Sequence, residues 1–312
     1  MNYLEYGKAI CYSGYRKGQS PKGDSPTKEQ VREDLHILVN DGYKYIRMYD
    51  PNRHARYALE VIREDNLPLR CIIGIDSDSE VNNRECPFEV QNYTDEELKA
   101  RIERNDREVD KLIDLVKEFD EYVVAVSVGN ENTPVWTAHK VSEQRLIGHA
   151  RKLKANLDKP VTFCEGALDW PNITDLAKEL DIISVHSYPY HYGTPIEEAV
   201  AVNKEHYAAM KALFPDKQVI FTEVGWSSNS TSPSYNAFVD GKLVTITPKD
   251  GEPRRQSVDN EKRYIEELNS WLEEDKVIAF IFEAFDELWK GDVPEASECN
   301  FGLYNEERRK KF

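Results

Sequence analysis

The chain has 312 residues, 40% of them hydrophobic and 31% charged, a composition typical of a globular protein long enough to bury a large core. The formal net charge of −16 argues against nucleic acids and anionic membrane surfaces as partners. It leaves room for a neutral ligand such as a sugar.

Cysteine usage and hydropathy add little about the setting in which the protein works. The five cysteines form no CxxC pair and no cluster with the spacing of a zinc site, so we expect buried thiols rather than a disulfide framework. No apolar run is long enough for a transmembrane helix, and the N-terminus lacks the apolar region of a signal peptide. The protein is extracellular or periplasmic if a leader has been removed, and cytoplasmic if Met1 is its native start. We expect a monomer.

Short apolar segments alternate with amphipathic helical segments along the whole chain. Eight of the apolar segments have the length and the composition of buried strands: 8–14, 43–50, 69–76, 121–131, 160–166, 181–190, 218–226 and 277–285. Helical periodicity fills the intervals between them. The order of elements is therefore strand, helix, strand, helix, repeated to the end of the chain.

Helix starts are marked by capping residues. Thr27 with Gln30, and Thr94 with Glu97, have the spacing of capping boxes that open one-faced helices. The segment 194–197, Thr-Pro-Ile-Glu, reads as the N-cap and first turn of another helix. A polar segment of about thirty residues follows the seventh strand and reads as a loop.

Eight strands separated by helices fit a (β/α)8 TIM barrel better than a doubly wound sheet. We find no linker, low-complexity segment or repeat, so we expect one α/β catalytic domain over residues 1–312. In such a barrel the functional side chains lie at the C-terminal ends of the strands.

The predicted strand ends carry many carboxylates. The polar residues found there are Arg47, Tyr49, Asp50, Asp76, Asn130, Glu131, Glu165, His186, Tyr188, Tyr190, Glu223, Glu283, Asp286 and Glu287. Any single carboxylate of this group could merely cap a helix or pair with an arginine. The whole constellation indicates acid/base or nucleophilic carboxylate chemistry, as in glycoside hydrolysis, which needs two carboxyl groups of opposite protonation state.

Aromatic residues lie close to the same strand ends, and aromatic faces with polar residues between them suit sugar rings. They are Tyr49, Trp136, Trp170, Tyr188, Tyr190, Tyr192, Trp226, Phe285 and Trp289. A metal site is disfavoured because the histidines lack ligand spacing, and there is neither a phosphate-binding loop nor a dinucleotide fingerprint. We therefore expect neither a metal nor a cofactor.

Several segments resemble the recurring blocks of glycoside hydrolase family 17, the β-1,3-glucanase family of (β/α)8 barrels. The two signature segments are SVGNE (127–131) and FTEVGWSS (221–228). Other blocks follow in the family's order: IRMYDPN (46–52), VHSYPY (185–190), IFEAFDELWK (281–290) and ECNFGLYN (298–305). The segment CYSGYRKGQSP (11–21) looks more microbial than plant-like, so the chain resembles a microbial laminarinase.

The resemblance implies retaining hydrolysis of β-1,3-glucan, with Glu131 as general acid/base and Glu223 as nucleophile. It implies that Asn130 contacts the sugar 2-hydroxyl and that Tyr49 helps to keep Glu223 ionised. A retaining pair of carboxyl groups should lie about 5–5.5 Å apart.

Further binding residues follow from the same blocks and from the aromatic pattern. The resemblance implies that Glu287, Lys290 and Glu298 support the cleft around the acid/base. Our candidates for sugar contacts are Tyr188, Trp136 and Trp226. Gly225 would let the backbone turn close to a ligand, while Glu165 and Glu283 are interpreted as supporting groups.

The sequence is compatible with three functional hypotheses. The leading one is an endo-acting β-1,3-glucanase. The second is a β-1,3-glucanosyltransferase that uses the same two glutamates but passes the glycosyl unit to a sugar instead of to water. The third is a glucan-binding protein without catalysis, which the presence of both glutamates disfavours.

Overall fold

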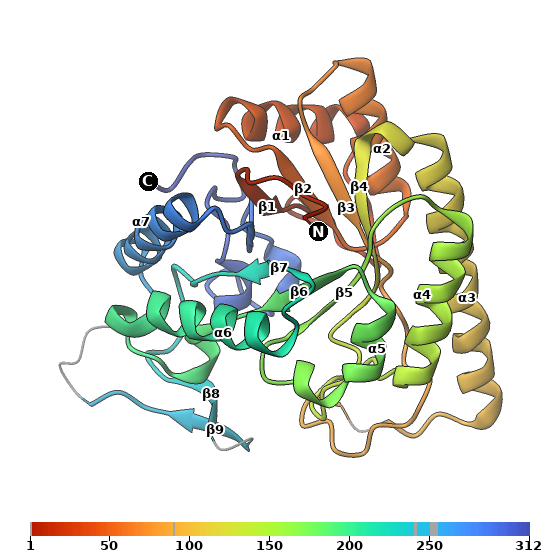
Figure 1. Cartoon of the computed structure of the whole chain (residues 1–312). Coiled ribbons are helices and arrows are strands. Elements are labelled where there is room, and N and C mark those ends of the chain that lie inside the picture. The colour runs from red at the N-terminus through yellow and green to blue at the C-terminus, as the bar shows by residue number, and fades with distance from the viewer. Residues whose placement is uncertain (1, 90, 240–241, 250–254) are drawn as a thin grey trace.

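A computed structural model describes residues 2–89, 91–239, 242–249 and 255–312. Its centre is a closed barrel of eight parallel strands, in the order β1-β10-β7-β6-β5-β4-β3-β2. Seven helices run along the outside of these strands in the described residues (Figure 1). The predicted single-domain (β/α)8 barrel is confirmed.

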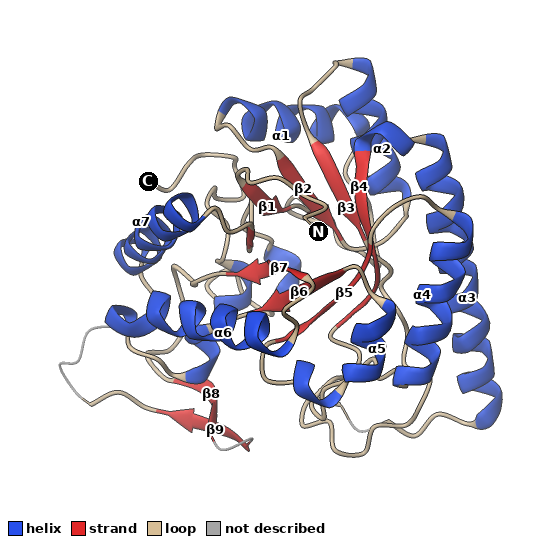
Figure 2. Cartoon of the chain, in the orientation of Figure 1, coloured by secondary structure: helices blue, strands red, loops and turns tan. Residues whose placement is uncertain are grey.

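The elements follow the predicted alternation closely. The barrel strands are β1 (Ala9–Cys11), β2 (Tyr45–Met48), β3 (Arg70–Ile73), β4 (Val123–Asn130), β5 (Val161–Gly166), β6 (Ile182–His186), β7 (Gln218–Val224) and β10 (Ala279–Ile281). The helices are α1 (Lys28–Asn40), α2 (Arg53–Glu64), α3 (Asp95–Glu118), α4 (Glu143–Asn156), α5 (Thr174–Glu179), α6 (Ala199–Leu213) and α7 (Val258–Asp275). Figure 2 shows the helices as an outer layer around the strands.

The strands are apolar on both faces because each face packs against a different core. Ala9 and Ile72 belong to a small cluster inside the barrel. Their chain neighbours Ile10, Cys71 and Ile73 belong to the larger cluster between the strands and the helices. Successive residues of a strand point to opposite faces, so a strand buried on both sides must be apolar at nearly every position.

Both predicted capping boxes form. Thr27 accepts a hydrogen bond from the backbone of Gln30 at the start of α1, and Thr94 does the same for Glu97 at the start of α3. In each case the side chain three residues on reaches back to the capping residue. All five cysteines are buried free thiols. None of the helices in the described part of the chain is both long and apolar enough to cross a membrane.

Two local predictions are wrong. The polar segment after β7 contains an antiparallel hairpin, β8 (Tyr235–Val239) and β9 (Lys242–Ile246), instead of an irregular loop. An Asp-Gly dipeptide between two apolar runs, as in this segment of the sequence, favours a hairpin. The helix expected at Thr194 is a short 3₁₀ turn, Ile196–Glu198, from which α6 continues.

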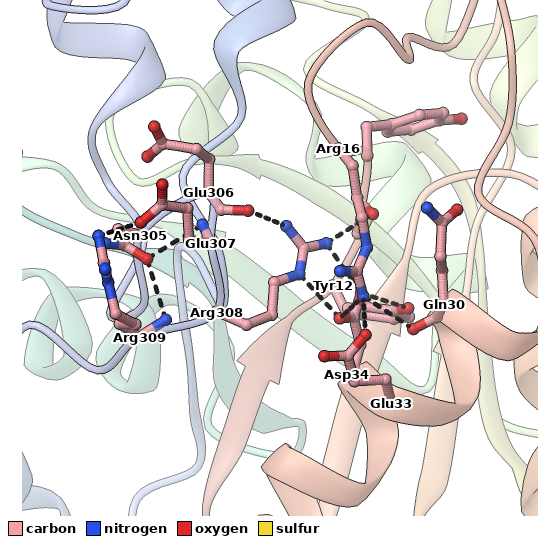
Figure 3. Close-up of polar contacts among 12 residues, drawn as sticks. Tyr12, Arg16, Gln30, Glu33, Asp34, Asn305, Glu306, Glu307, Arg308 and Arg309 are labelled. Carbon is pink, nitrogen blue, oxygen red and sulfur yellow. Dashed lines mark hydrogen bonds and ion pairs between the residues drawn. The ribbon is translucent and has the colours of Figure 1, made fainter.

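Arg308, near the C-terminal end of the sequence, links the loop that follows β1 to helix α1. The Arg308 guanidinium donates two hydrogen bonds to Asp34 of α1, 2.8 and 2.9 Å long, and a third to the carbonyl oxygen of Gly14. Arg16 and Tyr12 also donate to Asp34 (Figure 3). The side chains of Arg308 and Asp34 are only 2% and 0% exposed, so this ion pair is buried.

Removing one partner of a buried ion pair leaves the other charge without compensation. We therefore expect Arg308→Met to lower the free energy of unfolding by about 3 kcal/mol, because Asp34 keeps Arg16 but loses its bidentate partner. Arg309→Met is the matched control, since the Arg309 side chain is exposed and forms an ion pair with the nearby Glu307. Urea unfolding curves of the two variants measure the difference. Equal midpoints for both variants would contradict a structural role for the Arg308–Asp34 pair.

Candidate active site

A cleft of about 1160 Å³ lies at the C-terminal mouth of the barrel. Glu131 follows β4, Glu223 lies near the end of β7, and both line this cleft. Tyr15 and Trp289, from the loops after β1 and β10, line one side. Because β1 and β5 are opposite each other in the ring of strands, residues from the β5 loop line the other side.

Glu223 is held by donors from β2 and the residue after it, across the barrel mouth, and from the loop after the adjacent strand β6. Arg47 of β2 donates to Glu223 Oε1 at 2.5 Å, and the Tyr49 hydroxyl donates to the same oxygen at 3.2 Å. The Tyr188 hydroxyl donates to the other oxygen, Oε2, at 2.6 Å. The side chain is 8% exposed and still belongs to the lining of the cleft.

These donors keep Glu223 ionised. Burial alone would raise the pKa of the Glu223 carboxyl, but the positive charges of His186 and Arg47 and the hydrogen bonds from Tyr188 and Arg47 lower it to about 2. A carboxylate that is ionised throughout the physiological range and faces a cleft has the properties of a nucleophile.

Glu131 has a different environment. Its side chain is 22% exposed, and its backbone has a φ of 48°, in the left-handed region. Such a conformation costs a non-glycine residue about 1–3 kcal/mol and persists only where the surroundings enforce it. Here the Glu131 N–H donates to the carbonyl oxygen of Cys164, and the Asn132 side chain accepts from the Asn130 N–H.

His186 of β6 stands between the two carboxylates. Its Nδ1 lies 2.8 Å from Glu131 Oε1 and 3.6 Å from Glu223 Oε2. Burial would lower the pKa of the imidazole, but the charge of Glu223, the neighbouring Cys164 thiol and Glu131 raise it to about 10. At neutral pH the ring is therefore a cation that can donate a hydrogen bond to either carboxylate.

Oxygen atoms of Glu131 and Glu223 lie within 4.8 Å of each other, and His186 Nδ1 lies within the same distance of both. This spacing is much shorter than the roughly 6.5–9.5 Å of an inverting pair and close to the spacing of a retaining pair. The same three groups could also ligate a metal ion. A cation there would have to compete with Arg47 and the protonated His186 for the same oxygens.

Most of the predicted binding residues face the cleft. Asn130, Tyr49, Tyr188, Trp136, Lys290 and Glu298 all belong to its lining. Glu287 does not: it is 1% exposed and accepts hydrogen bonds from Ser13 and the Tyr15 backbone. Its carboxylate also pairs with Lys290, so Glu287 supports the cleft wall from behind and does not bind substrate directly.

The position of Trp226 differs from the one expected. Its indole is 1% exposed and lies against Tyr190 and Tyr264, while its Nε1–H donates to the carbonyl oxygen of Arg255. The expectation that Trp226 offers its face to a sugar is therefore wrong, because the segment before α7 covers the ring. It is a core residue of the β7 loop.

The structural reason for a glycine at position 225 also differs from the one expected. A Cβ atom at this position would lie 2.3 Å from the carbonyl oxygen of Phe282. Glycine is therefore required because the backbone at this position packs closely against the segment that follows β10, and not because it approaches a ligand.

The sequence assigns no role to two residues that contact the Glu131–Glu223 pair. Arg47 and His186 were noted only as polar residues at strand ends. Their partners lie on other strands, 176 residues away for Arg47 and Glu223, and 55 for His186 and Glu131. The available signal was positional: both are polar residues in otherwise apolar strands, near the ends that build the site.

Comparisons with known proteins identify the family. The pattern of the BtgE/BtgC glycoside hydrolase domain matches residues 9–302. A probable glucan endo-1,3-beta-glucosidase, btgC, of Aspergillus fumigatus is 27% identical over 214 residues, which are 64% of this chain and 30% of that protein. The cell surface mannoprotein MP65 of Candida albicans is 23% identical over 304 residues, 96% of this chain and 66% of that protein. The chain thus spans about a third of the Aspergillus relative.

Solved structures show the same fold. A family 17 β-1,3-glucanosyltransferase from Rhizomucor miehei has a TM-score of 0.71 at 20% identity, covering 97% of this chain and 95% of the other. A β-1,3-glucanase and pollen allergen of Cryptomeria japonica, CJP38, has a TM-score of 0.63 at 13% identity, with 98% of each chain covered.

The match to the family pattern extends over nearly the whole barrel, from β1 to the segment after β10, and so includes both glutamates. The resemblance to family 17 in the sequence motifs is confirmed. The chain belongs to the BtgE/BtgC glycoside hydrolase domain family.

Proposed function

We propose that the protein is a retaining, endo-acting β-1,3-glucanase with Glu223 as nucleophile and Glu131 as general acid/base. The observation that carries the proposal is the pair itself: two carboxylates within 4.8 Å, one of them locked in the ionised state by Arg47 and Tyr188. The substrate class is taken from the family and from the resemblance of the sequence to laminarinases.

In the first step the ionised Glu223 attacks the anomeric carbon of the scissile glucosyl unit. Glu131 donates its proton to the glycosidic oxygen, the bond from that oxygen to the anomeric carbon breaks, and the shortened chain leaves as an alcohol. The product is a glycosyl ester on Glu223. His186, whose Nδ1 lies 2.8 Å from Glu131 Oε1, then stabilises the newly ionised Glu131 by a charged hydrogen bond.

In the second step Glu131 takes a proton from water, and the resulting hydroxide attacks the anomeric carbon. The ester bond to Glu223 breaks, and the carboxylate returns to its donors Arg47, Tyr49 and Tyr188. Two inversions leave the sugar with its original configuration.

Asn130 is oriented for contact with the sugar. Its side-chain oxygen accepts a hydrogen bond from Arg47, which leaves the amide nitrogen to donate toward the cleft. A donor beside the nucleophile suits the 2-hydroxyl group, whose hydrogen bond strengthens as positive charge develops on the ring.

Endo action is supported by lining residues on both sides of the catalytic pair. Tyr15 and Trp289 come from the β1 and β10 loops, whereas Trp136 and Leu168 come from the β4 and β5 loops on the opposite side of the barrel. A polysaccharide can therefore contact the cleft on both sides of the bond that is cleaved.

A specific feature favours glucanosyl transfer as the second candidate. The general acid must stand on the side of the leaving group, so the loops near β4 form the side where an acceptor would bind. Phe88, Val135 and Leu168 lie there and expose 61%, 54% and 61% of their surface. Exposed apolar groups of this kind can hold an acceptor sugar and reduce the access of water.

Glucan hydrolysis and glucanosyl transfer differ in their products. With laminaripentaose as substrate, we expect only shorter oligosaccharides at early times under the leading hypothesis. Chromatography and mass spectrometry of the products provide the measurement. Oligosaccharides longer than the pentamer at millimolar substrate would favour the transferase and overturn hydrolysis as the main activity.

Azide distinguishes the roles of the two glutamates. Glu223→Ala should lower kcat on laminarin by at least about a thousandfold, because the nucleophile is lost. When azide is added, this variant should form the α-glycosyl azide, because azide then replaces the nucleophile. Glu131→Ala should lose about 10²–10⁴-fold and give the β-glycosyl azide by attack on the glycosyl ester. NMR of the products separates the anomers. A Glu223→Ala enzyme as active as the wild type would contradict the assignment.

The pH profile reports the pKa of Glu223. The free enzyme needs an ionised Glu223, so kcat/KM should fall only as pH approaches about 2 from above. Tyr188→Phe removes a donor to the ionised form, which raises this pKa and moves the acid limb upward by about one pH unit. Tyr190→Phe is the control, because the Tyr190 hydroxyl bonds to Gln256 instead. Identical acid limbs for both variants would show that Tyr188 does not stabilise the nucleophile.

A further inference from the structure

The turn that presents Glu131 is fastened to the neighbouring strand β5. Glu131 has left-handed backbone geometry, and its N–H donates to the carbonyl oxygen of Cys164 at 2.9 Å. The next residue in β5, Glu165, is completely buried and does not line the cleft. Its side chain points back to the same turn.

Glu165 makes three hydrogen bonds with defined partners. Its Oε2 accepts from the Thr133 backbone N–H at 3.2 Å and from the Thr133 hydroxyl at 2.7 Å. Its Oε1 accepts from the Gly166 N–H at 2.8 Å. Thr133 is two residues after Glu131, so Cys164 and Glu165 together hold the strained residue on both sides.

We propose that Glu165 is a positioning residue for the acid/base: through Thr133 it holds the turn in the geometry that brings the Glu131 carboxyl to the glycosidic oxygen. This inference rests on the proposed function, because it assumes that Glu131 is the proton donor. Glu165 does not line the cleft, and its hydrogen bonds are to Thr133 and Gly166, so we expect it to act through the turn that carries Glu131.

A threonine hydroxyl is a suitable hydrogen-bond partner for Glu165, because the protonation state of Glu165 depends on the charge of the nearby Glu131. Burial, together with the nearby charge of Glu131, raises the pKa of Glu165 to about 8. Near neutral pH the carboxyl is therefore mostly protonated. A hydroxyl group can donate to the ionised form and accept from the protonated form, so the Thr133–Glu165 contact persists in both states.

The test separates positioning of a proton donor from a general loss of structure. Phenyl and 2,4-dinitrophenyl β-laminaribiosides have the same sugar but differ in their need for a proton on the leaving oxygen. The steady-state kcat/KM for each reports the first, glycosylation step. The variants are Thr133→Val, which loses the hydroxyl at nearly constant shape, Thr133→Ser, which keeps it, and Glu165→Ala.

For Thr133→Val we expect kcat/KM on the phenyl glycoside to fall about tenfold, as for loss of one buried hydrogen bond to the Glu165 carboxyl group. We expect kcat/KM on the dinitrophenyl glycoside to change less than about twofold. Glu165→Ala should show the same selectivity with a larger loss, and Thr133→Ser should match the wild type. If Glu165→Ala fails to fold, the two Thr133 variants still decide the question.

Equal losses on both glycosides, or no loss for Thr133→Val, would overturn the positioning role. Wild-type enzyme and Glu131→Gln serve as references. If the wild type cleaves neither glycoside nor laminarin, the proposed function itself fails. If Glu131→Gln loses activity selectively on the phenyl glycoside but the Thr133 and Glu165 variants do not, only the inference about Glu165 fails.

Discussion

The buried contact between Arg47 and Glu223 is the interaction on which the rest of the site depends. A carboxylate that is almost fully buried would normally become neutral, because burial penalises its charged form. Arg47 crosses the mouth of the barrel from β2 to β7 and supplies a permanent positive charge at 2.5 Å. It also accounts for the orientation of Asn130, because the same guanidinium donates to the Asn130 side chain.

The barrel surrounds the two glutamates differently, which suits the different roles that we propose for them. Glu223 lies within a regular strand and receives donors from three side chains, so its charge is fixed. Glu131 lies on a strained turn just beyond a strand, is more exposed, and forms a side-chain hydrogen bond with His186. A group that must gain and lose a proton in each cycle needs this freer setting, but it also needs a backbone that holds it in place. The hydrogen bonds between β5 and the turn hold this backbone in place.

Much of this architecture was predictable from the sequence. The eight buried strands, the capping boxes at Thr27 and Thr94, and the presentation of Glu131 and Glu223 at strand ends follow from local patterns and from the family motifs. The roles of Arg47 and His186 could not be derived, because they depend on which strands face each other across the barrel. The burial of Trp226 could not be derived for a related reason: only the folded chain shows that the Arg255 side chain lies over its ring and that the Arg255 carbonyl oxygen accepts from its Nε1–H.

Trapping of the glycosyl enzyme tests the central claim most directly. With 2,4-dinitrophenyl 2-deoxy-2-fluoro-β-laminaribioside, the fluorine slows both steps and the good leaving group preserves the first, so the intermediate accumulates. Proteolysis and tandem mass spectrometry of the inactivated enzyme should place the fluorinated sugar on Glu223. A label on Glu131, Glu165 or Glu283, or hydrolysis with inverted configuration and without any adduct, would contradict the account.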